Sequence, residues 1–265
     1  MYIDFYGLKT FPFSITSNPE FFFASDSHKE ALACLLYGIQ EKRGIILMTG
    51  EVGTGKTTLC KTLLTGLPSN IKTSLILNPY FSEVQLLQAV IQDFGIIAVK
   101  KSRLDIVNAL NSFLLDIRLQ GGNAVLIVDE AQNLTNRQLE QVRLLSNLET
   151  SDEKLLQIIL VGQPELDEKL KAFGLRQIRQ RICIKYKLVP LREEEVKDYI
   201  DFRLKKAGDI SLAIEPSAYK VIYEFSKGIP RLINVLCDRA MLCGFVKDRK
   251  VFDEEILKAC IEELK

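Results

Sequence analysis

The sequence predicts an α/β protein in which a three-layer domain with a five-stranded parallel sheet precedes a small all-helical domain. Three observations support this fold class. Strand-like and helix-like segments alternate from Gly44 to Leu188. The segment Ala124–Val128 is apolar throughout, as expected for a parallel strand covered on both faces. After Pro190 only helical periodicity remains. The boundary is therefore expected near 189–192, giving domains 1–190 and 191–265.

The elements follow in order along the chain. The N-terminal segment of about 40 residues is rich in aromatic side chains. Pro12 and Pro19 break it into turns, so no regular strand is expected there. A helix is expected at Asp26–Glu41. The expected strands are Gly44–Thr49, Thr73–Leu77, Ala124–Val128, Leu155–Val161 and Ile182–Leu188. The expected helices of the first domain are Lys56–Thr65, Val84–Asp93, Arg103–Leu119, Arg137–Leu148 and Pro164–Phe173. Those of the second are Glu193–Lys206, Pro216–Ser226, Arg231–Val246 and Asp253–Leu264, with no strand.

Composition excludes several functional classes. The 265 residues carry 35 basic and 34 acidic side chains, a net charge of +1, which argues against binding nucleic acid as a whole-chain function. His28 is the single histidine, which excludes multi-histidine metal sites. The six cysteines form no CxxC pair and are expected to be free thiols in the cytoplasm. Neither a signal peptide nor an apolar run of about 18–20 residues is present, so we expect no membrane insertion by this chain.

The strongest motif is a phosphate-binding loop. It matches GxxxxGK[ST] at every fixed position, between an apolar strand and a helix. Its residues are Gly50, Glu51, Val52, Gly53, Thr54, Gly55, Lys56 and Thr57, and Thr58 follows. Glycines let the backbone N–H groups curl around phosphate oxygens, while the helix directs its positive end at them. Lys56 would reach the β- and γ-phosphates of ATP and the Thr57 hydroxyl would bind Mg²⁺, whereas Thr58 would pack or cap. The alternative is a glycine-rich turn with a solvated lysine.

A second motif follows the expected strand at 124–128. Asp129 and Glu130 follow it at the carboxyl edge of the predicted sheet, where ligands bind in such folds. Asp129 would hold Mg²⁺ through its water shell, and Glu130 would polarise the attacking water as a general base. A helix N-terminus favoured by acidic charge is the alternative. The NKxD sequence of GTPases and the LSGGQ signature of transporter ATPases are absent, and small-molecule kinases rarely carry this acidic pair, which leaves an ATP hydrolase.

A segment free of Asp and Glu, 174–190, carries five basic side chains over 17 residues: Arg176, Arg179, Arg181, Lys185 and Lys187. Its three arginines precede the last strand, where ring-forming ATPases place an arginine that reaches the neighbouring subunit's γ-phosphate. Arg179 or Arg181 would act in this way, so full activity is expected to need a homo-oligomer. A solvated basic face and a patch that contacts nucleic acid are the alternatives.

Three further polar residues are candidates for sensing the nucleotide. Arg231, at the start of a helix in the second domain, would contact the γ-phosphate of its own subunit, or else pair with a surface carboxylate. Gln163, after the fourth strand, would orient the attacking water, or else serve as a turn residue. Asn78, expected to end the second strand, would hold Glu130 inactive until a partner binds.

Two N-terminal features have weaker functional expectations. His28 follows a helix start and is expected to be a surface or capping histidine. Phe11-Pro12-Phe13 would form a wall beside the adenine. Cys60, on the helix after the phosphate loop, is expected to pack in the core.

In these motifs the sequence resembles the AAA+ ATPases and, among them, the ExeA/GspA family. The resemblance covers essentially the whole chain, and the stretches after the phosphate loop are the most specific to the family. It rests on these segments: 5–8, 12–13, 28–32, 50–58, 129–134, 144–150, 162–166, 179–182 and 228–238.

The resemblance implies a cytoplasmic ATPase that helps to assemble a bacterial envelope complex of the secretin or pilus type. It also implies a ring-like homo-oligomer and an inner-membrane partner of the GspB/ExeB type. Family members typically continue into a transmembrane helix and a peptidoglycan-binding region, so this chain is expected to be either the ATPase portion of a longer protein or a short relative. The rival hypotheses are a DNA-associated regulatory ATPase of the transposition target-selector type, which shares the same core, and a nucleotide-gated scaffold with negligible turnover.

Overall fold

The computed structural model describes residues 2–97, 102–208 and 212–264. These residues form two compact units. The helical unit combines the N-terminal residues up to His28 with Glu51–Thr58 and the residues from Val189 onward. The sheet unit consists of Lys29–Gly50 and Leu59–Leu188. The phosphate loop thus groups with the helical unit, although it directly follows a strand of the sheet.

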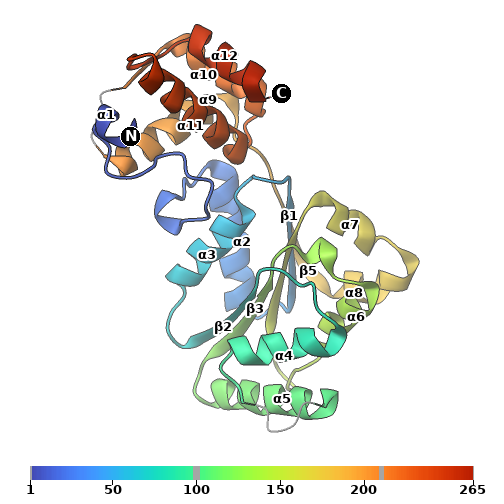
Figure 1. The fold of residues 1–265 in the computed structure, drawn as a ribbon. Coiled ribbons are helices and arrows are strands. Elements are labelled where there is room, and N and C mark those ends of the chain that lie inside the picture. Colours follow the sequence, from blue (N-terminus) through green and yellow to red (C-terminus); the bar gives the residue numbers. More distant parts are fainter. Residues whose placement is uncertain (1, 98–101, 209–211, 265) are drawn as a thin grey trace. The chain divides into compact units, whose positions relative to one another are not determined.

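The sheet unit contains the predicted parallel sheet (Figure 1). Its five strands have the order β2-β3-β4-β1-β5, and each pair of neighbours is parallel. Strand β4 therefore lies between β1, which leads into the phosphate loop, and β3, which leads into the acidic pair. The bounds are β1 Ile45–Gly50, β2 Ile71–Ile76, β3 Asn123–Val128, β4 Gln157–Gly162 and β5 Ile182–Leu188.

Helices cover both faces of this sheet, which confirms the three-layer prediction. Alternate residues of the central strands supply each face, since successive side chains of a strand point to opposite sides. On one face Ile45, Leu126 and Leu160 share a buried cluster with α4, α5, α6, α7 and α8. On the other face α2 approaches the sheet closely, because a Cβ on Gly38 would lie 2.3 Å from the Ile46 side chain. The helices are α2 Asp26–Gln40, α3 Lys56–Gly66, α4 Glu83–Asp93, α5 Arg103–Leu119, α6 Asn136–Leu145, α7 Pro164–Leu170 and α8 Arg176–Arg181.

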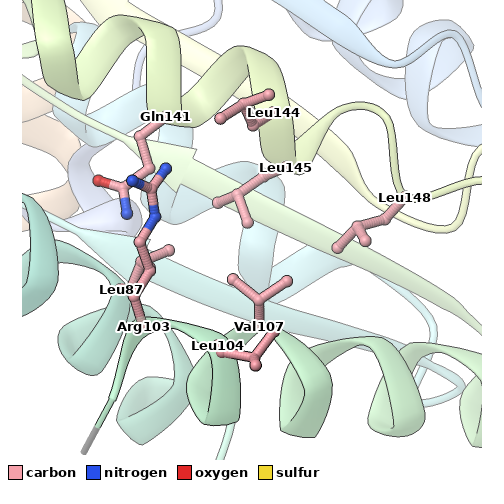
Figure 2. Close-up of a pocket in the computed structure, with 8 residues that line it drawn as sticks. All are labelled: Leu87, Arg103, Leu104, Val107, Gln141, Leu144, Leu145 and Leu148. Carbon is pink, nitrogen blue, oxygen red and sulfur yellow. The ribbon is translucent and has the colours of Figure 1, made fainter.

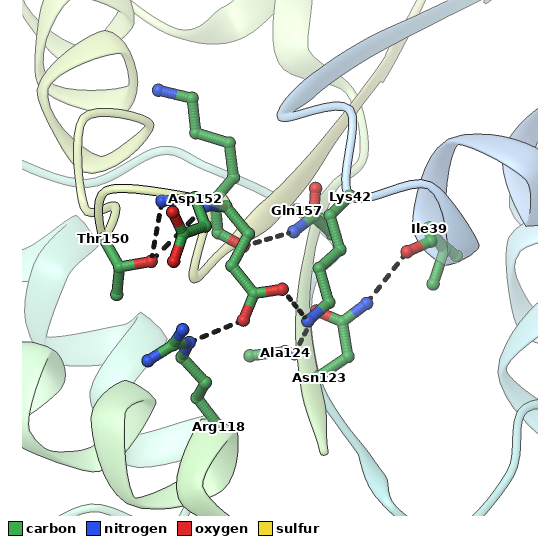
Figure 3. A network of polar contacts seen from close by, with 10 residues as sticks. Ile39, Lys42, Arg118, Asn123, Ala124, Thr150, Asp152 and Gln157 are labelled. Atoms are coloured by element: carbon green, nitrogen blue, oxygen red, sulfur yellow. Dashed lines mark hydrogen bonds and ion pairs between the residues drawn. The ribbon is translucent and has the colours of Figure 1, made fainter. Parts of the chain in front are cut away.

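A network of polar contacts lies at the end of the sheet where strands β3 and β4 begin (Figure 3). The Glu153 carboxylate accepts hydrogen bonds from Lys42 and, at 2.6 Å, from Arg118. These two cations lower the pKa of Glu153, Lys42 having the larger effect. Asn123 donates to the Ile39 carbonyl at 2.9 Å, which ties the end of α2 to the start of β3. The network is on the edge opposite the predicted active site.

The helical unit contains four long helices: α9 Glu193–Ala207, α10 Pro216–Ser226, α11 Pro230–Val246 and α12 Glu254–Leu264. It also contains the short N-terminal helix α1 Tyr2–Tyr6. A parallel pair of two-residue strands, β6 Ala213–Ile214 and β7 Val251–Phe252, joins them. The prediction that this region lacks strands is therefore wrong at these four residues. Strands of two residues are too short for alternating polarity to indicate them.

The N-terminal segment packs within the helical unit through Arg203. This guanidinium, 7% exposed, donates to the carbonyls of Pro12 at 2.6 Å and Ser14 at 3.0 Å. Phe13 is fully buried in the same core, so its ring is not available as an adenine wall, whereas Phe11 is 55% exposed and packs edge-on against Tyr2. The adenine-wall prediction can thus apply to Phe11 alone.

The expectation that the cysteines are free thiols is met. All six cysteines are free thiols, and Cys60 is buried. In the described part of the chain, no helix combines the length and the apolar character that crossing a bilayer would require.

Candidate functional site

The phosphate loop is organised around one backbone carbonyl, that of Glu51. It accepts three hydrogen bonds: from the Thr54 amide at 3.3 Å, the Thr54 hydroxyl at 2.8 Å and the Lys56 ammonium at 2.9 Å. Thr54 is completely buried and Lys56 is 6% exposed. The loop therefore holds its lysine inside, where the ammonium can meet phosphate oxygens, rather than in solvent as the alternative interpretation required.

Two groups from distant parts of the helical unit hold the outer side of the loop. The Arg231 amide, at the start of α11, donates to the Gly53 carbonyl at 3.2 Å. The His28 imidazole contacts the Thr54 carbonyl through Nε2 at 3.0 Å. In a trans peptide the C=O and the next N–H point in opposite directions. Because His28 fixes the Thr54 carbonyl, the Gly55 N–H must point away from His28.

His28 is neither exposed nor merely a cap, which corrects the expectation from sequence. It is 4% exposed, and its Nδ1 lies 2.6 Å from the Ser25 hydroxyl. A carbonyl only accepts, so Nε2 carries the proton and Nδ1 accepts from Ser25. Burial lowers the pKa of His28, partly offset by the Thr54 carbonyl and the Glu195 charge. The structure thus favours the neutral imidazole in this one tautomer.

Two glycines of the loop are required by geometry. Gly53 has φ +82° and Gly55 has φ +97°, in the left-handed region that side chains disfavour. A Cβ at Gly53 would lie 2.6 Å from the Arg231 Cβ, and one at Gly55 would lie 3.1 Å from His28 Nε2. Side chains there would fill the space that the anchoring groups occupy, so the two glycines and the two anchors form one packed arrangement.

Arg231 combines this backbone role with an exposed guanidinium. In the part of the chain that the structure describes, no ion pair joins it to a carboxylate, so the alternative of a surface salt bridge receives no support. Its position beside the phosphate loop fits the prediction of a nucleotide-sensing arginine.

The acidic pair lies in the sheet unit, at the carboxyl end of β3. Asp129 is 1% exposed, and its Oδ1 accepts from the Glu130 amide at 2.9 Å. Glu130 has φ +50°, a left-handed conformation that costs free energy in a non-glycine residue. This conformation turns the chain sharply into the short helix η2 Ala131–Asn133. Such strain concentrates at functional sites, which fits a catalytic role for Glu130.

The Glu130 carboxylate is held by two glutamine amides. Gln132 and Gln163 both donate through Nε2 to its Oε2, the latter at 3.3 Å. The Gln132 Oε1 accepts the Gln163 amide N–H at 3.1 Å, which links the ends of β3 and β4. Lys169 then fixes the turn by donating to the carbonyls of Gln132 and Leu134.

The prediction that Asn78 restrains Glu130 is therefore wrong in its choice of residue. β2 ends at Ile76, Asn78 is exposed, and Gln132 and Gln163 make the contacts expected of Asn78. Sequence reasoning missed Gln132, although it stands only two positions after Glu130. Gln163 was correctly placed after β4, and it contacts the general-base candidate directly.

The basic segment forms α8 and then edge strand β5. Arg179 is half-buried and donates to the Lys171 carbonyl at 3.4 Å, whereas Arg176 and Arg181 are exposed. Lys185 lies 3.4 Å from an Asp167 oxygen. The basic charge is thus partly engaged, and of the two candidate trans arginines Arg181 is the more exposed.

Known proteins resemble this chain in sequence and in fold. The family described as AAA domain matches residues 39–170. General secretion pathway protein A of Aeromonas hydrophila is 44% identical over 264 residues, which is 99% of this chain and 48% of that protein. The chain thus spans about half the length of that curated relative.

Solved structures share the fold at low identity. The Aeropyrum pernix ORC2 protein in ADPNP–ADP complexes superposes with a TM-score of 0.68 at 15% identity, covering 91% of this chain and 67% of that one. Cdc6p from Pyrobaculum aerophilum gives 0.69 at 16% identity, over 89% and 66%. The RuvB Holliday junction branch migration motor of Thermotoga maritima gives 0.60 at 20% identity, over 91% and 69%. At these identities the likeness establishes the AAA+ fold alone.

Proposed function

The chain belongs to the ExeA/GspA family of AAA+ P-loop proteins, and from this premise we propose that it binds ATP with Mg²⁺ and hydrolyses it to ADP and phosphate. The observation that carries the proposal is the phosphate loop, whose Gly53 and Thr54 carbonyls are held on its outer side while Lys56 is buried inside. Such a loop offers N–H donors and an ammonium to an anion, which fits the negative charge of a triphosphate.

The residues around this loop have complementary roles. Lys56 would neutralise the β- and γ-phosphates, and the N–H groups of 50–58 would cradle them. The Thr57 hydroxyl and the Asp129 carboxylate are oxygen donors of the kind that Mg²⁺ prefers. In the described residues no cluster of three or more His, Cys, Asp or Glu side chains is arranged to hold a metal. When bound, Mg²⁺ stabilises the charge that develops on the phosphate oxygens.

Hydrolysis would depend on Glu130 as the general base. Gln163 contacts the carboxylate of Glu130, so its amide would orient the same water that the base would polarise. The contacts from Gln132 and Gln163 reduce the freedom of the carboxylate, and their rearrangement would be part of activation. Arg231 would sense the γ-phosphate from its own subunit, and Arg181 or Arg179 would act from the neighbouring subunit of a homo-oligomer.

The cellular role proposed for this ATPase is the assembly of a bacterial envelope complex. It rests on the identity with General secretion pathway protein A. By the same resemblance, the chain would work on the cytoplasmic side with an inner-membrane partner of the GspB/ExeB type. A DNA-dependent role has no specific observation in its favour, since the net charge is +1.

The test is phosphate release by the purified chain with ATP and Mg²⁺, together with titration of a fluorescent ADP analogue. Lys56→Ala is expected to weaken nucleotide binding at least about 10-fold, because its ammonium would contact the phosphates in every bound state. Glu130→Gln is expected to keep nucleotide affinity within about twofold and to slow turnover at least about 100-fold. Equal turnover in wild type and Glu130→Gln would contradict the proposal, and stimulation by DNA that falls steeply with salt would favour the rival.

A further inference from the structure

A cavity of about 410 Å³ lies on the sheet unit between three helices, and none of the residues assigned to ATP lines it (Figure 2). Its walls are mostly leucine: Leu87 of α4, Leu104 of α5, and Leu144 and Leu145 of α6. Leu104 is 69% exposed and Leu144 is 41% exposed. Because exposed leucines that border a cavity leave apolar surface in water, occupation by an apolar group would be favourable.

One wall of the cavity carries a buried amide. Gln141 is 2% exposed, and in the described structure neither its Nε2 nor its Oε1 has a hydrogen-bond partner. Leaving a buried donor or acceptor unpaired is unfavourable, because the group has lost its hydrogen bonds to water. Gln138, one turn earlier on α6, shows the normal situation: its Oε1 accepts from Thr135 and its Nε2 donates to the Phe81 carbonyl at 2.6 Å. The amide of Gln141 therefore lacks a partner among the described residues of the sheet unit.

A cation lies at the same end of the cavity. Figure 2 shows the Arg103 guanidinium and the Gln141 carboxamide together at one end of the lining, with Leu148 at the other. Arg103 is exposed and begins α5, where the helix dipole disfavours a positive charge. No carboxylate pairs with it within the described ranges. The guanidinium and the helix N-terminus together would attract an anion.

We propose that this cavity binds an extended peptide segment of a partner protein, with a leucine-sized side chain next to an acidic residue. The peptide C=O would accept from Gln141 Nε2 and its N–H would donate to Oε1, because an amide is the group that satisfies both atoms at once. The leucine would fill the apolar cavity and the carboxylate would meet Arg103. A helical segment fits less well, since the amides in a helix interior are already paired. A simple apolar acid would leave Oε1 unpaired.

The experiment uses the whole chain, labelled with ¹³C in its leucine and valine methyl groups, and the peptide Ac-Asp-Leu-Ala-NHMe as the probe. Addition of the peptide up to 5 mM is expected to shift the methyl signals of Leu104, Val107, Leu144 and Leu148 with a saturable dependence. The matched control is the same peptide with N-methyl-leucine, which lacks the N–H and should bind at least about 10-fold more weakly. Replacing its Asp by Lys should weaken binding at least threefold.

Variants separate a binding role of Gln141 from a structural one. Gln141→Leu removes the unpaired amide at similar size, so it should unfold in urea at the same or a higher concentration than wild type and should lose the peptide response. Gln138→Leu, the control on the same helix, should lower the unfolding midpoint because its two bonds are lost. Arg103→Glu should reduce peptide affinity while leaving the unfolding midpoint unchanged.

Three results would overturn the proposal: no saturable shift at 5 mM peptide, equal affinity for the N-methylated peptide, or a lower unfolding midpoint for Gln141→Leu. Octanoate binding as tightly as the peptide would assign the cavity to small apolar acids instead. None of these readouts depends on ATP, so the proposal stands or falls separately from the hydrolase activity.

Discussion

The stability of the fold should decrease on mild acidification through one side chain, His28. Burial lowers its pKa, so the folded protein binds a proton less readily than the unfolded chain, whose imidazole titrates near 6.5. The contribution is therefore fully present above pH 6.5 and is lost as the pH falls below it. Glu195, the charged group that acts on the imidazole from α9, opposes the shift but is outweighed by burial.

The size of the expected stability loss depends on how readily His28 binds a proton in the folded and in the unfolded protein. At pH 5.5 the unfolded imidazole binds a proton more readily than the folded one, so folding is less favourable there, with an upper limit of about 1 kcal/mol. His28 is the only histidine, and most unperturbed carboxylates titrate near pH 4, so little else titrates between pH 7.5 and 5.5. The reference variant is His28→Gln, whose amide can still donate to the Thr54 carbonyl but does not titrate.

The assay is urea unfolding followed by far-ultraviolet circular dichroism, at pH 7.5 and 5.5, without nucleotide. Wild type should lose more unfolding free energy than His28→Gln between the two pH values. At pH 7.5 the variant should be less stable than wild type by about 1 kcal/mol, because the Ser25 bond is lost. Equal losses in the two proteins on acidification would refute the assignment of a neutral, Nε2-protonated imidazole.

Three other changes have definite expected outcomes. Glu153→Gln should lower the free energy of unfolding in urea by about 1 kcal/mol or less, since the ion pairs of Glu153 with Lys42 and Arg118 are partly exposed. It should leave ATP turnover unchanged, because Glu153 is at the edge of the sheet opposite to Glu130. Gly228→Ala should lower the free energy of unfolding by more than about 2 kcal/mol in the same assay and should weaken nucleotide binding. The reason is that a Cβ at this position would lie 1.9 Å from the Leu191 carbonyl oxygen, and that the backbone has φ +75°. Mixing Arg181→Ala with Glu130→Gln subunits should restore phosphate release above either alone, and identical rates at every ratio would exclude catalysis in trans.

The sequence predicted the sheet well because its signals are local. The apolar strands, the glycines of the phosphate loop and the acidic pair after β3 each stand within a few consecutive residues. Periodicity also found the long helices of the second domain. It missed α8, because six residues give too few turns for an apolar face to recur.

The predictions that were wrong or missing concern contacts between residues far apart in the sequence. His28 and Thr54 are 26 positions apart, and Gln163 and Glu130 are 33 apart, so no local pattern shows that they meet. Asn78 was chosen because it was expected at a strand end, yet the strand stops earlier, at Ile76. Gln132 was overlooked because a glutamine in a turn has no distinctive spacing. Only the folded turn at Glu130, with φ +50°, brings its amide back to the carboxylate.

Under the proposed function the two units have separate roles, which kinetic measurements can distinguish. The helical unit contains Lys56 and both anchors of the phosphate loop, so changes at His28 or Arg231 would act first on the binding of phosphate by the loop. The sheet unit contains Glu130 and its glutamine partners, which touch the base rather than the loop. Changes in the first group should therefore appear in nucleotide affinity, and changes in the second in the turnover of bound ATP. A ligand that alters affinity alone would then be acting on the helical unit, and one that alters turnover alone on the turn at Glu130.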